Sequence, residues 1–266
     1  MENILTNVDS RSVISEAVFN KKLWELKKIY RNVKFDNNVQ IIDFTIGFVA
    51  LEYFEEREKR IKGKLDATKI YWSDCRKPIP EETVANLVEY IARLQREQFG
   101  EFSSYMQKVK DTIHGIEGQK KPLVSDAEAQ QIYDVINSMK PLHESGFDLF
   151  GAIYEMFADP NEKKEFGQYY TRRHYTHIFA KLLLKNETYF TAEKKFTVLD
   201  PACGTGGFLT EGFKVLKSAY SATNTLTEDA KNFIENECFW GIDVKGDNIA
   251  RTKLNMFLVG DGHTHT

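Results

Sequence analysis

The chain has 266 residues, of which 42% are hydrophobic and 28% are charged, as in ordinary globular proteins that bury a sizeable core. Its formal net charge of −3 argues against a basic surface over the whole chain, so any affinity for DNA needs a local basic face or partner subunits. Because no apolar run reaches membrane-spanning length, Met1 to Arg11 is polar and the three cysteines lack paired spacing, we expect a cytoplasmic protein with no membrane contact.

Residues 1–146 are predicted to form an all-helical N-terminal domain. Apolar residues recur at helical spacing up to Tyr30, and Asn38 is a candidate cap for a second helix that runs through Phe54. That second helix is apolar on more than one face, which predicts a central place in a helical bundle. Further helices are expected at 80–94, 102–113 and 125–139, the last opened by a Ser-x-x-Glu capping box, with a short strand at 69–72.

Residues 147–157 then predict another helix, and a charged loop follows it. After the loop comes the segment Gly167-Gln-Tyr-Tyr-Thr171, and a further helix is expected from Thr171 or Arg172 to Leu184.

A short apolar run, Phe196–Leu199, predicts a buried strand of a parallel sheet. Asp200 follows it, Cys203 to Gly207 is a turn of small residues, and a helix is expected at 208–220. Ligands of open α/β sheets bind outside the carboxyl ends of the strands, so this turn is the candidate binding site. Glycines let a backbone approach a ligand closely, and a helix N-terminus offers free N–H groups to an anion.

A second run, Cys238 to Asp243, also ends in a carboxylate, which is placed to bind the hydroxyls of a ribose. A helix is expected at 248–258. The segment Val259-Gly-Asp-Gly262 is a candidate third strand end, which would place Asp261 near an adenine amine.

The turn fits neither a dinucleotide nor a phosphate-binding loop. Gly204-Thr-Gly-Gly207 lacks the third spaced glycine of G-x-G-x-x-G, and no Gly-Lys-Ser/Thr occurs. Asp200 would repel a pyrophosphate, but it is suited to accept hydrogen bonds from an ammonium group. The methionine end of S-adenosylmethionine carries an ammonium beside a carboxylate and matches this polarity.

Together these segments resemble adenine-specific DNA methyltransferases, and more narrowly the modification subunit of type I restriction enzymes. The run Asp200-Pro-Ala-Cys-Gly-Thr-Gly-Gly-Phe-Leu209 resembles their cofactor motif. The segment Gly167-Gln-Tyr-Tyr-Thr171 is similar to their Gly-Gln-Phe/Tyr-Tyr/Phe-Thr-Pro-Arg, with Arg172 in place of proline. The resemblance implies a cofactor site for S-adenosylmethionine made of Gln168, Tyr169, Tyr170, Thr171, Arg173, Asp200, Gly204, Thr205, Gly206, Gly207, Asp243 and Asp261.

The resemblance also implies a fold and partners. Residues 147–266 would be the N-terminal part of a Rossmann-like, S-adenosylmethionine-dependent methyltransferase domain, truncated within its sheet. The family transfers a methyl group to adenine N6 of DNA, and the subunit works beside a specificity subunit and a restriction subunit.

The family's catalytic Asn-Pro-Pro-Phe/Tyr or Asp-Pro-Pro motif is missing from all 266 residues. In the family that side chain accepts from the adenine amino group while an aromatic ring stacks on the flipped base. We therefore assign no catalytic residue, and we expect the chain alone to be inactive. We assign no metal ligand either, because the pairs His174/His177 and His263/His265 lack a third ligand at a usual spacing. A non-catalytic cofactor-binding or scaffold module, and a methyltransferase for RNA or protein, stay open as alternatives.

Overall fold

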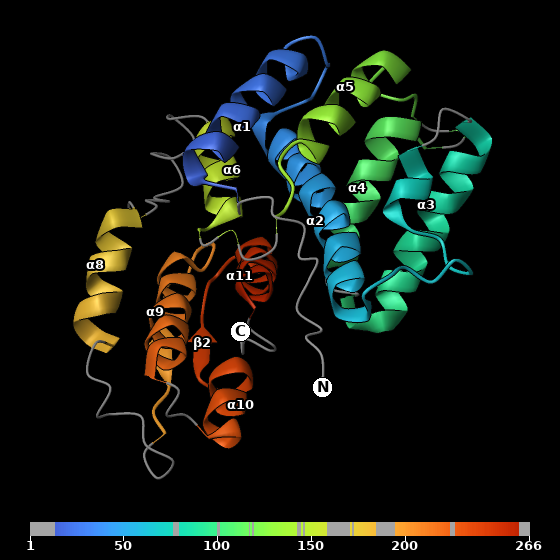
Figure 1. Ribbon diagram of the computed structural model, residues 1–266. Helices are drawn as coiled ribbons and strands as arrows, with labels where there is room; N and C mark the ends of the chain where they lie inside the picture. Colours follow the sequence, from blue (N-terminus) through green and yellow to red (C-terminus); the bar gives the residue numbers. More distant parts are fainter. Residues whose placement is uncertain are drawn as a thin grey trace.

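The computed structural model describes residues 14–76, 80–99, 102–116, 118, 120–142, 145, 147–158, 171, 173–184, 195–223 and 227–260. These residues are mostly helical, and they contain one two-stranded parallel sheet. In Figure 1 the helices from α1 to α6 gather in one body, and α8 to α11 with the sheet gather in a second. No helix in the described part of the chain is long and apolar enough to cross a membrane.

The first body is built around one long helix, as the sequence predicts. Its helices are α1 (Glu16–Tyr30), α2 (Asn38–Lys62), α3 (Pro80–Leu94), α4 (Ser103–His114), α5 (Asp126–Asn137) and α6 (Leu149–Phe157). Asn37, not Asn38, caps α2 by accepting a hydrogen bond from the Gln40 N–H, and residues 42–55 of α2 are all buried. The capping box at Ser125 is confirmed, because its side chain and that of Glu128 cap α5 reciprocally. The strand expected at 69–72 is wrong, since Trp72–Arg76 forms the short 3₁₀ helix η1 instead.

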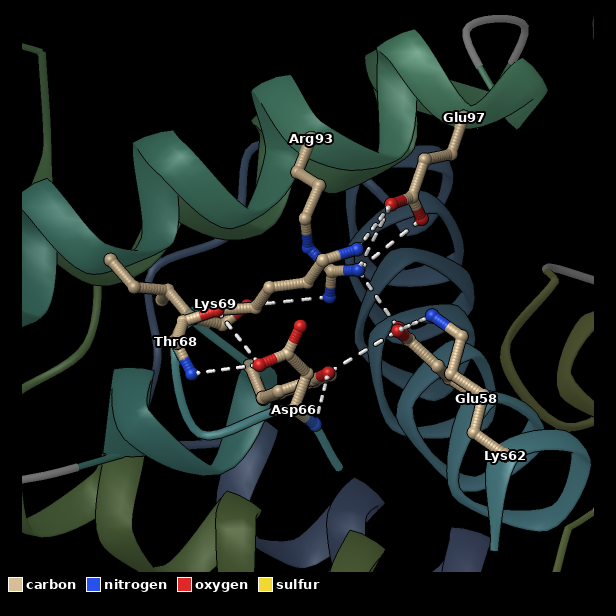
Figure 2. Close-up of polar contacts among 9 residues, drawn as sticks. Glu58, Lys62, Asp66, Thr68, Lys69, Arg93 and Glu97 are labelled. Carbon is tan, nitrogen blue, oxygen red and sulfur yellow. Dashed lines mark hydrogen bonds and ion pairs between the residues drawn. The ribbon is translucent and has the colours of Figure 1, made fainter. Parts of the chain in front are cut away.

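A polar network fastens the end of α2 to α3 and to the loop between them (Figure 2). The Arg93 guanidinium donates to Glu58 Oε2 at 2.8 Å, to Glu97 of the π-helical turn Gln95–Phe99 and to the Ile70 carbonyl oxygen. The Tyr71 hydroxyl also donates to Glu58. Burial alone would raise the pKa of Glu58, but hydrogen bonds from Lys62 and Arg93 outweigh it and lower this pKa. The network therefore holds the loop around Ile70 and Tyr71, where a strand was expected, against α2 and α3.

The second body contains α8 (Arg173–Leu184), β1 (Val198–Asp200), α9 (Gly207–Thr223), α10 (Glu228–Asn236), β2 (Phe239–Gly241) and α11 (Gly246–Val259). The strands pair in parallel, with Asp200 opposite Gly241. The two strands and their parallel pairing are confirmed, but the burial predicted for 196–199 is wrong, because β1 starts at Val198 and Leu199 is 57% exposed. The third strand end expected at Val259 is wrong, because Val259 is the last residue of α11 and Gly260 caps it in a left-handed conformation with φ 99°.

Two hydrophobic clusters fill these bodies, and α11 supplies residues to both. Leu254 and Leu258 join the cluster formed by α1 to α6, whereas Met256 and Val259 join the cluster around β2 and α9. Tyr53 of α2 donates to the Phe257 carbonyl oxygen at 3.2 Å. The α11 helix, which belongs to the second body, thus also packs on the first body (Figure 1).

The contact between α2 and α4 yields the first testable prediction. A Cβ atom added to Gly47 would lie 2.3 Å from the Tyr105 carbonyl oxygen, a backbone atom that cannot move aside alone. We expect Gly47→Ala to lower the free energy of unfolding by about 2 kcal/mol or more, measured by urea denaturation. Gly246→Ala is the control, because nothing lies within 4 Å of its added Cβ. Equal stability of the two variants would contradict the close approach.

Candidate functional site

The parallel pairing continues past the two strands and brings their following loops together. The Ile242 N–H donates to the Asp200 carbonyl oxygen at 2.9 Å, and the Cys203 N–H donates to the Ile242 carbonyl oxygen at 2.9 Å. These bonds place the carboxylates of Asp200 and Asp243 at one edge of the sheet, as the sequence predicts.

The Asp243 carboxylate organises the backbone of both loops. Its Oδ2 atom accepts from the Gly204 N–H at 3.1 Å, and its Oδ1 atom accepts from the Lys245 N–H and from the Asn248 amide. A carboxylate offers about four acceptor positions, so within the described part of the chain Oδ2 keeps one for a further donor such as a hydroxyl. Gly204 donates its amide to Asp243, which makes this glycine a link between the loops.

The Asp200 carboxylate is half-buried and holds a negative charge without a cationic partner among the described residues. Its Oδ1 atom accepts from the Ala202 N–H at 3.1 Å. Burial raises the pKa of Asp200, and the nearby Asp243 charge raises it further, while the Ala202 bond partly opposes both. A cation beside this carboxylate would relieve the cost, so the position suits an ammonium group.

The turn between β1 and α9 depends on two glycines with positive φ. Gly204 has φ 57° and Gly206 has φ 83°, and the Gly206 N–H closes the turn on the Cys203 carbonyl oxygen at 2.8 Å. A Cβ atom on Gly206 would lie 2.9 Å from Cγ2 of Thr252 on α11. The Thr252 hydroxyl, in turn, donates to the Gly204 carbonyl oxygen at 2.8 Å. Only glycine at 206 lets α11 pack this close to the turn.

Cys203 is a buried residue of the turn, and its thiol lies 3.5 Å from the Thr252 hydroxyl. Burial raises the pKa of this thiol, so it stays protonated near neutral pH and makes a poor nucleophile.

Sequence reasoning missed a second polar residue of α11 that touches the turn. The Asn255 amide donates to the Thr205 carbonyl oxygen at 2.7 Å and to Asp148, the N-cap of α6. Asn248, which bonds Asp243, and Thr252 were missed as well. The signal available in the sequence was the helical spacing of the polar residues 248, 252 and 255 among apolar residues, and the structure shows that all three are buried.

The upstream segment is only partly within the described structure. Thr171 is exposed and lies just before α8, and Arg173 is the first residue of α8. The predicted residues Gln168, Tyr169, Tyr170 and Asp261 lie outside the described residues. Helix α8 packs on α9, where the His177 Nδ1 atom lies 2.9 Å from Glu211 Oε2. The helix that follows this segment therefore lies against the helix that starts at the turn.

The family model and the relatives that this chain matches are all DNA methylases or restriction enzymes. Residues 145–265 match the N-6 DNA Methylase family. The chain is 31% identical over 137 residues to the type II restriction enzyme and methyltransferase RM.BcgI of Heyndrickxia coagulans, covering 51% of this chain and 19% of that protein. It is 25% identical over 196 residues to the type I restriction enzyme StySPI methylase subunit of Salmonella potsdam, covering 70% of this chain and 33% of that protein.

The fold is also shared with a solved structure. A modification subunit ascribed to a type I restriction enzyme of Vibrio vulnificus YJ016 superposes with a TM-score of 0.59 at 17% identity. The superposition covers 96% of this chain and 56% of that one. The chain thus spans a third or less of the curated relatives described above, and about half of this structural neighbour.

The buried charge at Asp200 gives a pH-dependent prediction. Since its folded pKa is raised, the folded state holds the proton more tightly than the unfolded state, and this group costs stability as pH rises through that pKa. Asp200→Asn keeps an acceptor for Ala202 and should stabilise the ligand-free protein at about pH 7, by less than about 1 kcal/mol because solvent screens a half-exposed charge. The gain should fade below about pH 4, where the carboxyl is protonated in both states.

Thermal unfolding between about pH 3 and pH 8 measures this difference. Asp247→Asn, on an exposed side chain at the start of α11, is the control and should change stability by less than about 0.5 kcal/mol. An Asp200→Asn variant that is less stable than the parent at neutral pH would contradict the desolvated charge.

Proposed function

We propose, from the match of residues 145–265 to the N-6 DNA Methylase family, that this chain carries the cofactor half of a DNA adenine N6-methyltransferase. The cofactor is S-adenosylmethionine, which supplies the methyl group for the exocyclic nitrogen of adenine. The observation that carries the proposal is the pair of carboxylates, Asp200 and Asp243, held at one sheet edge on either side of a glycine turn.

Each part of the site has a role that its chemistry supports. The half-buried Asp200 binds the ammonium group, and the turn from Gly204 to Gly207 with the first N–H groups of α9 binds the carboxylate. The free acceptor position on Asp243 Oδ2 binds the ribose. These side chains orient the methyl donor, and catalysis of this kind relies on positioning without a covalent enzyme intermediate.

The upstream segment and Asp261 complete this proposal; Gln168, Tyr169, Tyr170 and Asp261 lie outside the described residues, whereas Thr171 lies just before α8 and Arg173 begins it. The segment from Gln168 to Thr171, with Arg173, closes over the methionine end, and Asp261 contacts the adenine ring of the cofactor. These roles come from the similarity of the segment to the family's motif.

We further propose that β1 and β2 belong to a larger, doubly wound parallel sheet. Leu199 and Trp240 lie opposite each other in the register and are 57% and 43% exposed, and Ile242 just beyond β2 is 55% exposed. Strands of parallel sheets are normally covered on both faces, so this apolar face fits contact with further elements of the same domain. On this proposal residues 1–146 are a helical domain and residues 147–266 the first part of the methyltransferase domain, whose first helix, α6, packs on α1 and α2 of the helical domain.

The names of the relatives support a proposal for the partners. The StySPI protein is named a methylase subunit of a type I restriction enzyme. By analogy this chain would act on DNA within a complex that also holds a specificity subunit and a restriction subunit. The formal net charge of −3 is in keeping with partners that supply part of the DNA affinity.

Cofactor titration tests the site. Calorimetry should show S-adenosylmethionine binding to the chain, and Asp243→Ala should weaken it at least about tenfold, because the variant loses the ribose contact and the link to Gly204. Asp247→Ala, an exposed aspartate four residues on, should bind as the parent does. If the folded parent binds no cofactor, the site proposal fails and a scaffold role takes its place.

A methyl-transfer assay tests whether the chain that binds the cofactor also lacks the catalytic motif's function. Because no Asn-Pro-Pro or Asp-Pro-Pro occurs in the sequence, the 266-residue chain should transfer no labelled methyl group to duplex DNA, even in a preparation that binds the cofactor. Transfer above the background of a heat-unfolded sample would show that another group within the chain performs the catalytic role.

A further inference from the structure

The side chain of Asn255 is buried, with 1% exposure, and it reaches three backbone or side-chain groups from different parts of the chain. Its Nδ2 atom donates to the Thr205 carbonyl oxygen and to Asp148 Oδ1, and its Oδ1 atom accepts from the Phe150 N–H at 3.4 Å. With two acceptors on one side and a donor on the other, only one orientation of the amide satisfies all three.

The bond to Thr205 acts on the shape of the turn. A peptide unit is planar, so holding the Thr205 carbonyl also holds the N–H of Gly206, which points the opposite way. That N–H closes the turn on the Cys203 carbonyl oxygen. Thr252, one helical turn earlier on α11, holds the preceding carbonyl at Gly204 in the same manner. Together these two side chains fix two successive peptide planes of the turn.

The bond to Asp148 connects the turn to the first body. Asp148 Oδ1 caps α6 by accepting from the Gly151 N–H at 2.7 Å, and the same oxygen accepts from Asn255. Helix α6 packs on α1 and α2. The turn is therefore joined, through one amide, to the helices that precede it by more than forty residues.

We propose that Asn255 is a positioning residue for the cofactor, which it does not itself touch. It holds the turn between β1 and α9 in the shape that binds the cofactor, and it ties that shape to the N-terminal helices through Asp148. The inference rests on the proposed cofactor site, and it adds a residue to which neither the strand-end acids nor the family motif points.

Two variants separate the two bonds. In Asn255→Asp a carboxylate replaces the donor and faces both Asp148 and the Thr205 carbonyl oxygen, so both bonds are lost. Adding Asp148→Asn removes the repulsion between two carboxylates at positions 148 and 255 and keeps the α6 cap, since Asn caps as well as Asp. The Thr205 carbonyl, however, still faces a carboxylate in the double variant.

We expect the double variant to regain most of the thermal stability that Asn255→Asp loses. Its affinity for S-adenosylmethionine should stay at least about tenfold below that of the parent. Asn236→Asp, on α10 and bonded to Asn232, is the matched control and should leave the affinity unchanged. A purely structural role would make stability and affinity recover together, and that result would overturn the proposal.

Hydrogen exchange in the cofactor-free protein tests whether Asn255 holds the turn, independently of whether the chain binds the cofactor. The Gly206 amide should exchange at least about tenfold faster in Asn255→Asp and in the double variant than in the parent. If the parent binds no cofactor, the proposed function fails, and the positioning role for the cofactor falls with it. If the parent binds cofactor but exchange at Gly206 does not change in either variant, the cofactor site stands and Asn255 does not hold the turn.

Discussion

The close approach of α11 to the turn at Gly206 is the constraint on which the rest of the site depends. Any side chain at 206 would collide with Thr252, so glycine there brings a whole helix within hydrogen-bond reach of the turn. Thr252 and Asn255 then satisfy carbonyl groups that burial would otherwise leave without partners. Helix α11 thus sets the shape of the turn through these two side chains. Asp200 and Asp243 lie at the ends of the two strands beside it.

The same helix is anchored on its other side to the N-terminal body. Arg251 of α11 pairs with the buried Asp43 of α2 at 2.9 Å, and the Tyr105 hydroxyl of α4 donates to the Asp247 carbonyl oxygen. Burial raises the pKa of Tyr105 to about 12, so it remains a neutral donor. A buried ion pair gives little net stability, but losing one partner leaves a buried charge at high cost, so a packing of α11 that separates Arg251 from Asp43 is disfavoured. Changes in the helical body can therefore reach the turn through α11.

The sequence predicted what depends on neighbours along the chain. The capping box at Ser125 and the start of α3 at Pro80 are local signals, and both were correct. The acids Asp200 and Asp243 were placed together because parallel strands end at one edge. Val259 was mistaken for a strand end, since an apolar residue before Gly-Asp-Gly also fits a helix that stops at a left-handed glycine. Asn255 escaped prediction because its partners lie 50 and 107 residues away in sequence.

The charges of Asp200 and Asp243 explain why a rigid turn and the packing of α11 occur together at this edge of the sheet. Two carboxylates near one another, one of them desolvated, make the ligand-free edge less stable, and the raised pKa of Asp200 is the sign of that cost. A flexible turn would relieve it by moving the charges apart or into water. Here the Gly204 bond to Asp243 and the hydrogen bonds from α11 keep the loops in place, so the unfavourable charge stays at the edge in the ligand-free protein. Rigidity supplied by a neighbouring helix thus lets this edge hold a carboxylate that has no cationic partner among the described residues, at the position proposed for the ammonium group.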